Sequence, residues 1–200
     1  MTTLLFLGTL LLLLILGIML INKLIRRKPV ALTLKKMGYL TSIYIGLWVI
    51  FKILSHDVVV PVGTDICFDD WCATIDQIDT GPAVQQQFVQ LGKDSLWVLL
   101  RVRVSNHARG IAQKPSEPRI HIIDGQGHAW SYSPKGQQLF EERAGEQTAI
   151  DSRLELHESF ETTLVYAVPQ NAKGLRILIE EGPFITNLLF PEDRQVFLFK

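Results

Sequence analysis

The sequence predicts an all-β antiparallel sandwich preceded by a two-helix transmembrane hairpin, and three observations lead to that prediction. Two long apolar runs lie close together near the start of the 200-residue chain. Beyond them, seven or more short segments alternate apolar with polar residues and are separated by turn-forming residues. No long segment there has helical periodicity. We therefore expect a hairpin over residues 1–56 and a sandwich domain over residues 57–200.

The two apolar runs cover residues 3–21 and residues 37–54, and the one charged residue within them is Lys52. A helix rises about 1.5 Å per residue, so runs of this length nearly cross a hydrocarbon core of roughly 30 Å. A cleaved signal peptide is the alternative for the first run. That alternative fits less well, because no basic residue precedes the run and no small-x-small cleavage site follows it.

Small residues recur at every fourth position of the second run, at Gly38, Ser42 and Gly46. This spacing places them on one face of a helix, where they allow a second helix to approach closely. Small residues are also common in membrane helices in general, so both readings stay open.

The segment between the runs, residues 22–36, is purely basic. It holds no acid and six basic residues, namely Lys23, Arg26, Arg27, Lys28, Lys35 and Lys36. Short basic loops remain on the cytoplasmic side of a membrane. We therefore expect a multi-pass protein of the cell membrane with a cytoplasmic loop, both termini outside, and a periplasmic or extracellular C-terminal domain. The lipid bilayer is its first expected partner.

Charge is divided unevenly between the two parts of the chain. Residues 1–56 hold seven Lys or Arg and no Asp or Glu, which leaves thirteen basic and all twenty acidic residues for residues 57–200. Nucleic-acid binding needs clustered positive charge, and the predicted domain is acidic. Nucleic acid is therefore not an expected partner.

The two cysteines of the chain lie in the segment ICFDDWC, residues 66–72. A hairpin with Asp69 and Asp70 as its turn places Cys67 opposite Cys72. Such a pair has Cα atoms about 4.5–5.5 Å apart, within the range of a disulfide, and an oxidising outer compartment permits the bond. Free thiols and a redox or metal role are the alternatives, although a zinc site normally needs further Cys or His ligands.

The clearest strand of the domain covers residues 96–104, LWVLLRVRV. Its alternation predicts one buried face and one wetter face. Trp97, Arg101 and Arg103 lie on the wetter face, and exposed Trp and Arg residues favour an interaction surface. The alternative is that Trp97 is buried by a neighbouring part of the molecule.

The other expected elements follow in chain order. A strand leaves the membrane directly over residues 56–63, and residues 73–78 return from the cysteine hairpin. Residues 85–91 are a weaker strand candidate with Phe88 in the core, and residues 136–143 form either a short helix or an irregular loop. Further strands are expected at residues 119–123, 128–132, 159–168, 175–179, 185–190 and 196–199.

Four motifs follow one another along the domain: LLRVRVSN (99–106), IIDGQG (122–127), LELHESFETTLVYAVP (154–169) and LRILI (175–179). Their order resembles a group of bacterial immunoglobulin-like domains of unknown function, found on membrane-anchored or lipid-anchored exported proteins. The resemblance implies an immunoglobulin-like sandwich over about residues 57–200, and it brings no catalytic residue. In one place the chain departs from the pattern, because Leu156-His157 replaces the expected Pro-Gly before Glu158.

The sequence contains no recognisable catalytic constellation. The histidines of the domain are scattered, and a zinc site from His121 and His128, which could face each other across a hairpin, would still lack ligands. There is no nucleophile elbow and no phosphate-binding glycine loop. We therefore expect no metal, no cofactor and no enzymatic activity.

The expected function is protein–protein interaction or envelope sensing by a membrane-anchored, extracytoplasmic β-sandwich. Its partner would be an envelope protein, whose identity the sequence does not reveal. The alternative is an accessory subunit of a membrane redox or transport complex, in which the two spans carry the function. Charge inside the spans would favour that alternative, and the spans offer Lys52 near one end.

Overall fold

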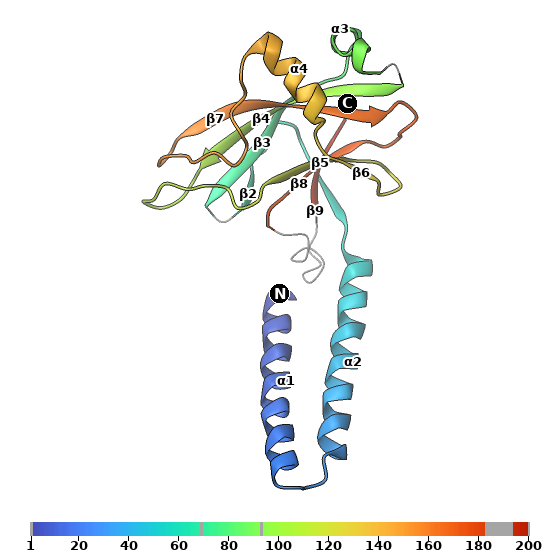
Figure 1. The fold of residues 1–200 in the computed structure, drawn as a ribbon, viewed down its shortest axis with the longest axis vertical. Helices are drawn as coiled ribbons and strands as arrows, with labels where there is room; N and C mark the ends of the chain where they lie inside the picture. Colours follow the sequence, from blue (N-terminus) through green and yellow to red (C-terminus); the bar gives the residue numbers. More distant parts are fainter. Residues whose placement is uncertain (1, 69, 93, 183–193, 200) are drawn as a thin grey trace. The chain divides into compact units, whose positions relative to one another are not determined.

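The chain forms two units, a pair of helices and a β-sandwich, which Figure 1 presents as a computed structural model. The structure describes residues 2–68, 70–92, 94–182 and 194–199. Among these residues, the first unit ends at His56 and the second begins at Asp57. Each unit has its own packing, and each is described by itself.

The first unit consists of α1 (Thr2–Ile25) and α2 (Ala31–Leu54), each of 24 residues. At 1.5 Å per residue, each helix is about 36 Å long. The segment between the helices covers residues 26–30, so both ends of the basic segment over residues 22–36 are helical. Lys and Arg are good helix formers, and Lys23 lies in the last turn of α1, where a cation is favoured.

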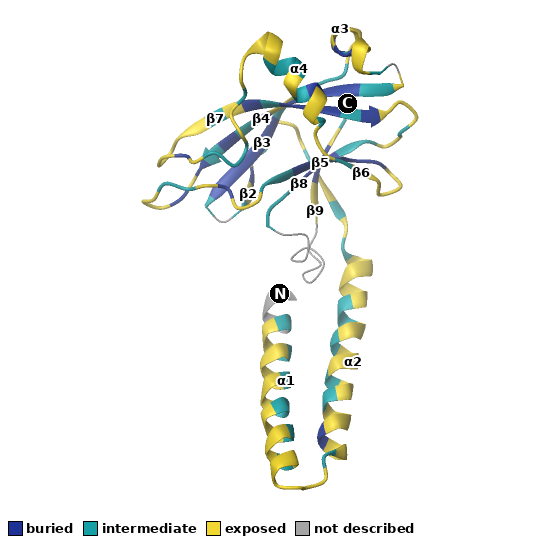
Figure 2. Cartoon of the chain, in the orientation of Figure 1, coloured by how far each residue is buried: buried dark blue, intermediate teal, exposed yellow. Residues whose placement is uncertain are grey.

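The two helices face each other through residues spaced three and four apart. Among the buried and half-buried residues of these helices are Thr33, Met37, Leu40, Tyr44 and Leu47 on α2, and Leu13, Leu16 and Leu20 on α1. This spacing keeps one side of each helix turned toward the other, as the partly buried sides in Figure 2 show. The remaining sides expose apolar side chains, with Leu14 60 % and Ile53 74 % exposed.

The small residues of α2 lie on an exposed side of the helix. Gly38, Ser42 and Gly46 are all exposed, and a Cβ atom added to either glycine would meet nothing within 4 Å. The close-approach reading therefore does not hold within the hairpin, where Leu40 and Tyr44 lie on the packed side instead.

The second unit is a sandwich of two sheets. The first sheet has the order β1-β9-β8-β5-β6 and is formed by β1 (Asp57–Val60), β9 (Arg194–Leu198), β8 (Arg176–Glu180), β5 (Arg119–Ile123) and β6 (Ala129–Trp130). The second sheet has the order β2-β3-β4-β7 and is formed by β2 (Ile66–Phe68), β3 (Trp71–Asp79), β4 (Ser95–Asn106) and β7 (Ser159–Pro169). Short helices between strands are α3 (Pro82–Gln87), the 3₁₀ helix η1 (Val89–Leu91) and α4 (Pro134–Ala144).

The first strand corrects the prediction of a purely antiparallel sandwich. β1 pairs in parallel with β9, and Asp57 lies opposite Arg194 in that register. The carboxylate of Asp57 forms an ion pair with Arg194 at 2.8 Å and a second ion pair with Arg176 of the neighbouring strand β8. Two cations on one carboxylate hold the start of the domain at the edge of the first sheet.

Of two segments between strands, one was predicted wrongly, and for the other the structure decides between the two alternatives. Residues 85–91 are helical rather than extended, because Pro82 suits the first turn of a helix and the glutamines after it do not alternate. Phe88 is nevertheless buried, as expected. Residues 136–143 are helical and belong to α4. The predicted strand at residues 185–190 lies outside the described residues.

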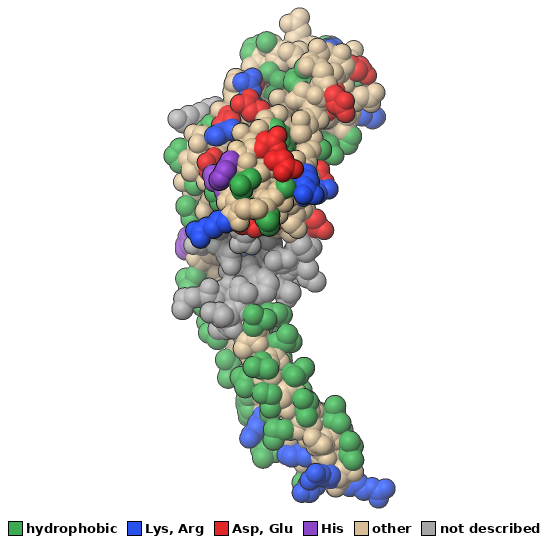
Figure 3. Space-filling model, turned by 90° about the vertical axis from the view of Figure 1, so that its left-hand side faces the viewer, with side chains coloured by type: hydrophobic (Ala, Val, Ile, Leu, Met, Phe, Trp, Pro, Cys, Tyr) green, Lys and Arg blue, Asp and Glu red, His purple; other side chains and the backbone are tan. Residues whose placement is uncertain are grey.

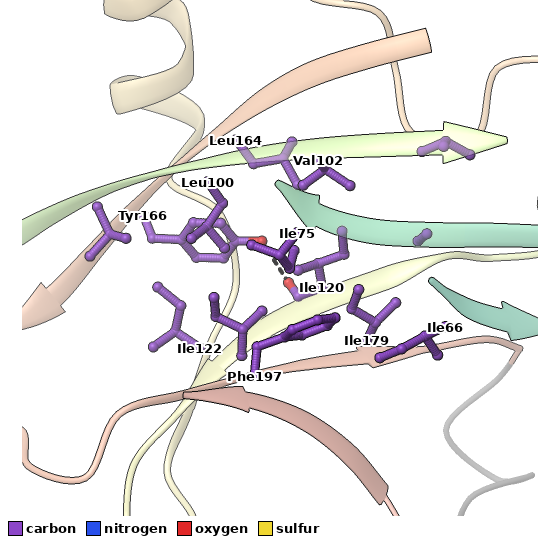
Figure 4. Close-up of a cluster of buried hydrophobic side chains, with 14 of the residues drawn as sticks. Ile66, Ile75, Leu100, Val102, Ile120, Ile122, Leu164, Tyr166, Ile179 and Phe197 are labelled. Carbon is purple, nitrogen blue, oxygen red and sulfur yellow. Dashed lines mark hydrogen bonds between the residues drawn. The ribbon is translucent and has the colours of Figure 1, made fainter. Parts of the chain in front are cut away.

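The main core lies between the two sheets, and a hydrogen bond joins the sheets across it. β4 and β7 direct alternate apolar side chains inward, and Figure 4 shows Leu100, Val102, Leu164 and Tyr166 among them. The hydroxyl of Tyr166 donates to the carbonyl of Ile120 on β5 at 2.8 Å. Burial raises the pKa of Tyr166 above its ordinary value, so the phenol remains a neutral donor.

Candidate functional site

The cysteine hairpin has the predicted register and contains the predicted disulfide. In the pairing of β2 with β3, Cys67 lies opposite Cys72 and Phe68 opposite Trp71. The two cysteines are bonded, with Cα atoms 4.0 Å apart, slightly closer than expected for such a pair. Cys67 is exposed and Cys72 is buried. The bond leaves neither sulfur free, so the free-thiol alternative does not hold in this structure.

Trp97 does not belong to an exposed interaction surface, which corrects the first of the three surface residues. It lies on the outer face of β4 as predicted, but only 4 % of it is exposed. Its ring stacks on Phe88 at a centroid distance of 4.9 Å, and Val165 of β7 packs beside it. Partly buried Leu139 and Phe140 of α4 complete this second apolar cluster on the outside of the sheet.

A glycine in α4 makes the cover over Trp97 fit closely. A Cβ atom on Gly136 would lie 2.8 Å from Cζ3 of Trp97 and 2.8 Å from Cγ1 of Val165. The hydroxyl of Ser133, the N-cap of α4, accepts a hydrogen bond from the amide of Gly136 at 3.2 Å and fixes the start of the helix. The helix backbone therefore approaches the sheet as closely as a residue without a side chain allows.

The side chain of Gln85 continues the sheet where β3 ends. The last register pair of β3 with β4 joins Asp79 to Leu99, so the backbone of Trp97 has no partner on that side. Gln85 supplies one, because its amide oxygen accepts from the Trp97 amide at 2.9 Å and its amide nitrogen donates to the Trp97 carbonyl at 2.7 Å. Two-point bonding of this kind imitates a strand neighbour.

The free edge of β7 is satisfied in the same manner by the segment around α4. Gln137 donates to the carbonyl of Thr163 at 3.0 Å and accepts from the amide of Val165 at 3.0 Å. The carbonyl of Val165 accepts from the amide of Ser133 at 2.7 Å, and the amide of Thr163 donates to Gln147 at 3.0 Å. An exposed strand edge invites pairing with another chain, and here the helix segment occupies it.

Arg103 is largely committed to contacts inside the domain. Its Nε and Nη2 atoms donate to the two carboxylate oxygens of Asp76 at 3.2 and 3.3 Å, and a second carboxylate, Asp65, lies 3.6 Å from Nη2. The hydrogen bond with Asp76, followed by the attraction of its charge, raises the pKa of Arg103 above its ordinary value. Asp76 sits at the bulge where β3 skips a residue between Ile75 and Gln77.

Arg101 is the residue of the predicted surface that is open to solvent. Its neighbours in the sheet register are Gln77 on β3 and Thr163 on β7. Across the described ranges of the chain, no hydrogen bond or ion pair involves its side chain. The outer face of the second sheet is therefore apolar and covered at one end, and polar and open at the other.

The histidines of the β5–β6 hairpin make separate contacts. His128 bonds the carboxylate of Asp124 through Nδ1 at 2.9 Å. Burial alone would raise the pKa of Asp124, but hydrogen bonds from the His128 side chain and from nearby backbone amides outweigh it and lower that pKa. Burial lowers the pKa of His121, which contacts the hydroxyl of Ser131 at 3.3 Å.

This pair of a serine and a histidine is not by itself a catalytic arrangement. A nucleophilic serine needs a base that is oriented by a third group, usually a carboxylate. Among the residues described, no carboxylate is hydrogen-bonded to His121. Within the residues that the structure describes, no group of three or more His, Cys, Asp or Glu side chains is placed to hold a metal ion.

Sequence reasoning missed the glutamines that complete the sheet. Gln85, Gln137 and Gln147 each bond a strand backbone, yet glutamine has no specific pattern at a strand edge. A signal was present in retrospect, because glutamines cluster at residues 85–87 and 137–138, in segments where alternation of apolar residues fails.

Comparison with known proteins yields structural likeness without a family. No protein-family model matches the chain, and no curated protein matches it in sequence. A conserved hypothetical protein from Bacillus anthracis is similar to it with a TM-score of 0.44 at 13 % identity, over 60 % of this chain and 87 % of that one. An uncharacterised β-sandwich protein from Clostridium difficile has the same TM-score and identity, over 73 % of this chain and 96 % of that one.

The secreted protein MPT63 from Mycobacterium tuberculosis is also similar, with a TM-score of 0.43 at 11 % identity, over 72 % of this chain and 98 % of that one. The chain has two N-terminal apolar helices and a β-sandwich, and the structures to which it is similar are of uncharacterised or secreted bacterial proteins. Its resemblance to the immunoglobulin-like domains of exported proteins stays a prediction.

Proposed function

We propose that this protein is a membrane-anchored, extracytoplasmic β-sandwich that binds another envelope protein and does not act as an enzyme. The observation that carries the proposal is the exposure of apolar side chains along α1 and α2. Each helix is long and apolar enough to cross a membrane. Exposed apolar surface of this extent needs cover, and a bilayer supplies it for a two-helix hairpin.

The orientation of the anchor is proposed from the distribution of charge. Six of the seven basic residues before His56 lie at the turn between the helices or within the adjoining helical turns. The positive-inside rule assigns that turn to the cytoplasm and the sandwich to the outside. A disulfide between Cys67 and Cys72 agrees with this assignment, because disulfides persist in oxidising compartments.

The polar end of the outer sheet face is the proposed contact surface for the partner. Arg101 is exposed and has no contact within the described residues that would hold it. Arginine is enriched at protein interfaces, where its planar group binds carboxylates in two-point fashion. An acidic segment of an envelope protein fits this surface.

A second function is favoured by the uncovered small residues of α2. Gly38, Ser42 and Gly46 form an exposed row, and rows of small residues let membrane helices pack closely. Under this alternative the protein is an accessory subunit of a membrane complex, and the spans rather than the sandwich make the specific contact.

The experiment that tests the anchor and its orientation is thiol labelling of intact cells with a membrane-impermeant maleimide. We expect labelling only after treatment with a reductant, mainly at the exposed Cys67. A chain with both cysteines replaced by serine is the blank. In that background Lys28→Cys reports on the turn, and we expect its labelling only after lysis.

The opposite pattern would overturn the proposal. Labelling of Lys28→Cys on intact cells, together with labelling of Cys67 only after lysis, would place the sandwich inside the cell. Recovery of the full chain in the soluble fraction would remove the membrane anchor altogether.

A further inference from the structure

The turn between α1 and α2, taken together with Lys35 and Lys36 near the start of α2, carries positive charge without any compensating acid. Arg26, Arg27, Lys28, Lys35 and Lys36 are all exposed, and Figure 3 shows Lys and Arg side chains gathered at this end of the hairpin. No Asp or Glu occurs before Asp57 in the sequence. Across the described residues, none of these five side chains takes part in an ion pair.

Lys23, the sixth basic residue of this segment, forms a hydrogen bond between the two helices. The ammonium group of Lys23 donates to the hydroxyl of Thr33 at 2.9 Å and so joins the end of α1 to the first turn of α2. This bond ties the two helices together beside the basic residues that follow α1.

Arg27 occupies a backbone position that normally belongs to glycine. Its φ is 52°, in the left-handed region. The amide of Arg27 donates to the carbonyl of Leu24 at 3.0 Å, and the amide of Lys28 donates to the carbonyl of Lys23 at 2.9 Å. These two bonds form the Schellman pattern at a helix end. Glycine would adopt this conformation without strain, so the arginine is there in spite of its backbone preference.

The first turn of α2 adds backbone donors to the same place. Its N-cap is Val30, which offers no side-chain cap, and the first turn contains no acid. The amide groups at the start of a helix lack partners within the helix and favour a phosphate or carboxylate. Free donors, guanidinium groups and ammonium groups therefore converge on one end of the hairpin.

We propose that this turn is a binding site for the phosphate groups of anionic phospholipids in the leaflet that it faces. The proposal rests on the membrane anchoring proposed above. Guanidinium groups bind phosphate oxygens in pairs, and ammonium groups add charge that attracts an anionic surface. The apolar helices hold the turn at the depth of the headgroups, so lipid phosphate is the ligand at highest local concentration.

The test uses the full chain reconstituted into vesicles of equal parts phosphatidylcholine and phosphatidylglycerol. The protein is then released in a nonionic detergent, and its retained lipids are counted by native mass spectrometry. We expect an excess of phosphatidylglycerol over phosphatidylcholine on the unmodified chain. The excess should fall when salt is raised from about 0.05 to 0.5 M before release, because salt screens exposed charges.

Two variants and one control sharpen the test. Arg27→Gly removes a charge while suiting the left-handed position, so it should lower the excess by up to about fivefold without weakening the hairpin. Lys35→Gln with Lys36→Gln should lower it further. Lys52→Gln is the matched control, because Lys52 lies in the last turn of α2 and should leave the excess unchanged.

The outcomes separate the two proposals. Equal retention of both lipids by a chain whose helices are inserted, as judged by protection from added protease, would overturn the lipid site and leave the anchor standing. An excess that survives all the variants, or that Lys52→Gln lowers equally, would also overturn the site. Failure of the unmodified chain to insert would overturn the anchor itself.

Discussion

The outer face of β4 consists of two halves that follow the same alternating pattern and end in opposite environments. Trp97 is buried beneath α3 and α4, whereas Arg101, four residues further along the same face, is exposed. The two halves differ because the segments after β3 and β6 fold back over only one of them. Alternation therefore predicts which side of a strand a residue occupies, whereas the connections between strands decide whether that side is exposed to solvent.

The largest effect is expected from removing the ring at the covered half. Trp97→Ala should lower the free energy of unfolding by about 3–5 kcal/mol, because it leaves a cavity between the sheet and the helices. Urea unfolding of the full chain in detergent, followed by circular dichroism, measures the change. A loss below about 1 kcal/mol would mean that Trp97 is not buried under the helices.

The next effect tests the close approach of α4. Gly136→Ala should destabilise the domain by about 1–3 kcal/mol through the contact of its new Cβ atom with Trp97 and Val165. An exposed helical glycine would respond in the opposite way, since alanine favours helix. Gln138→Ala, on the exposed side of α4, is the control and should change stability by less than about 0.5 kcal/mol. A stabilising Gly136→Ala would contradict the structure of the cover.

The hydrogen bonds of Gln137 with the edge of β7 can be tested separately from the cover over Trp97. Gln137→Ala should cost about 1–3 kcal/mol, because the backbone groups of Thr163 and Val165 lose partners in a partly buried place. It should also expose a strand edge, which size-exclusion chromatography would detect as self-association. A monomeric variant of unchanged stability would show that water replaces Gln137 without loss.

A smaller effect is expected at the boundary between the halves. Arg103→Gln should lower the free energy of unfolding by about 0.5–1 kcal/mol, because the Arg103 side chain is more than a third exposed and solvent screens its pair with Asp76. The difference from the unmodified chain should shrink in 1 M salt. Equal differences at low and high salt would mean that packing of the arginine stem, rather than charge, carries the effect.

The smallest effect on stability is expected at the open half, where binding should change instead. Arg101→Gln should alter the free energy of unfolding by less than about 0.5 kcal/mol. Crosslinking in intact cells should capture less of the proposed envelope partner with Arg101→Gln than with Arg103→Gln. Capture equal to that of the unmodified chain would remove Arg101 from the proposed contact surface.

Much of the sandwich was predictable because its signals are local. The alternation of β4 and β7 and the register of Cys67 with Cys72 follow from side chains that point to opposite faces of a strand. The parallel pairing of β1 with β9 was not predictable, since its partners lie at opposite ends of the domain sequence. Of the residues predicted to lie on an exposed face, Arg101 is open to solvent and Trp97 is covered by elements distant in sequence, and a role in binding stays a prediction.

Composition and spacing along the chain were enough to predict the division into an apolar helical pair and a β domain, the basic segment between the apolar runs, and the alternation within strands. These properties depend on composition and on spacing along the chain, which are visible without a structure. Only the folded domain shows that Gln85 and Gln137 complete the sheet, that Gly136 lets α4 approach it, and that half of the outer face of β4 is covered. Each of these depends on contacts between segments far apart in sequence, and such contacts carry no local periodicity.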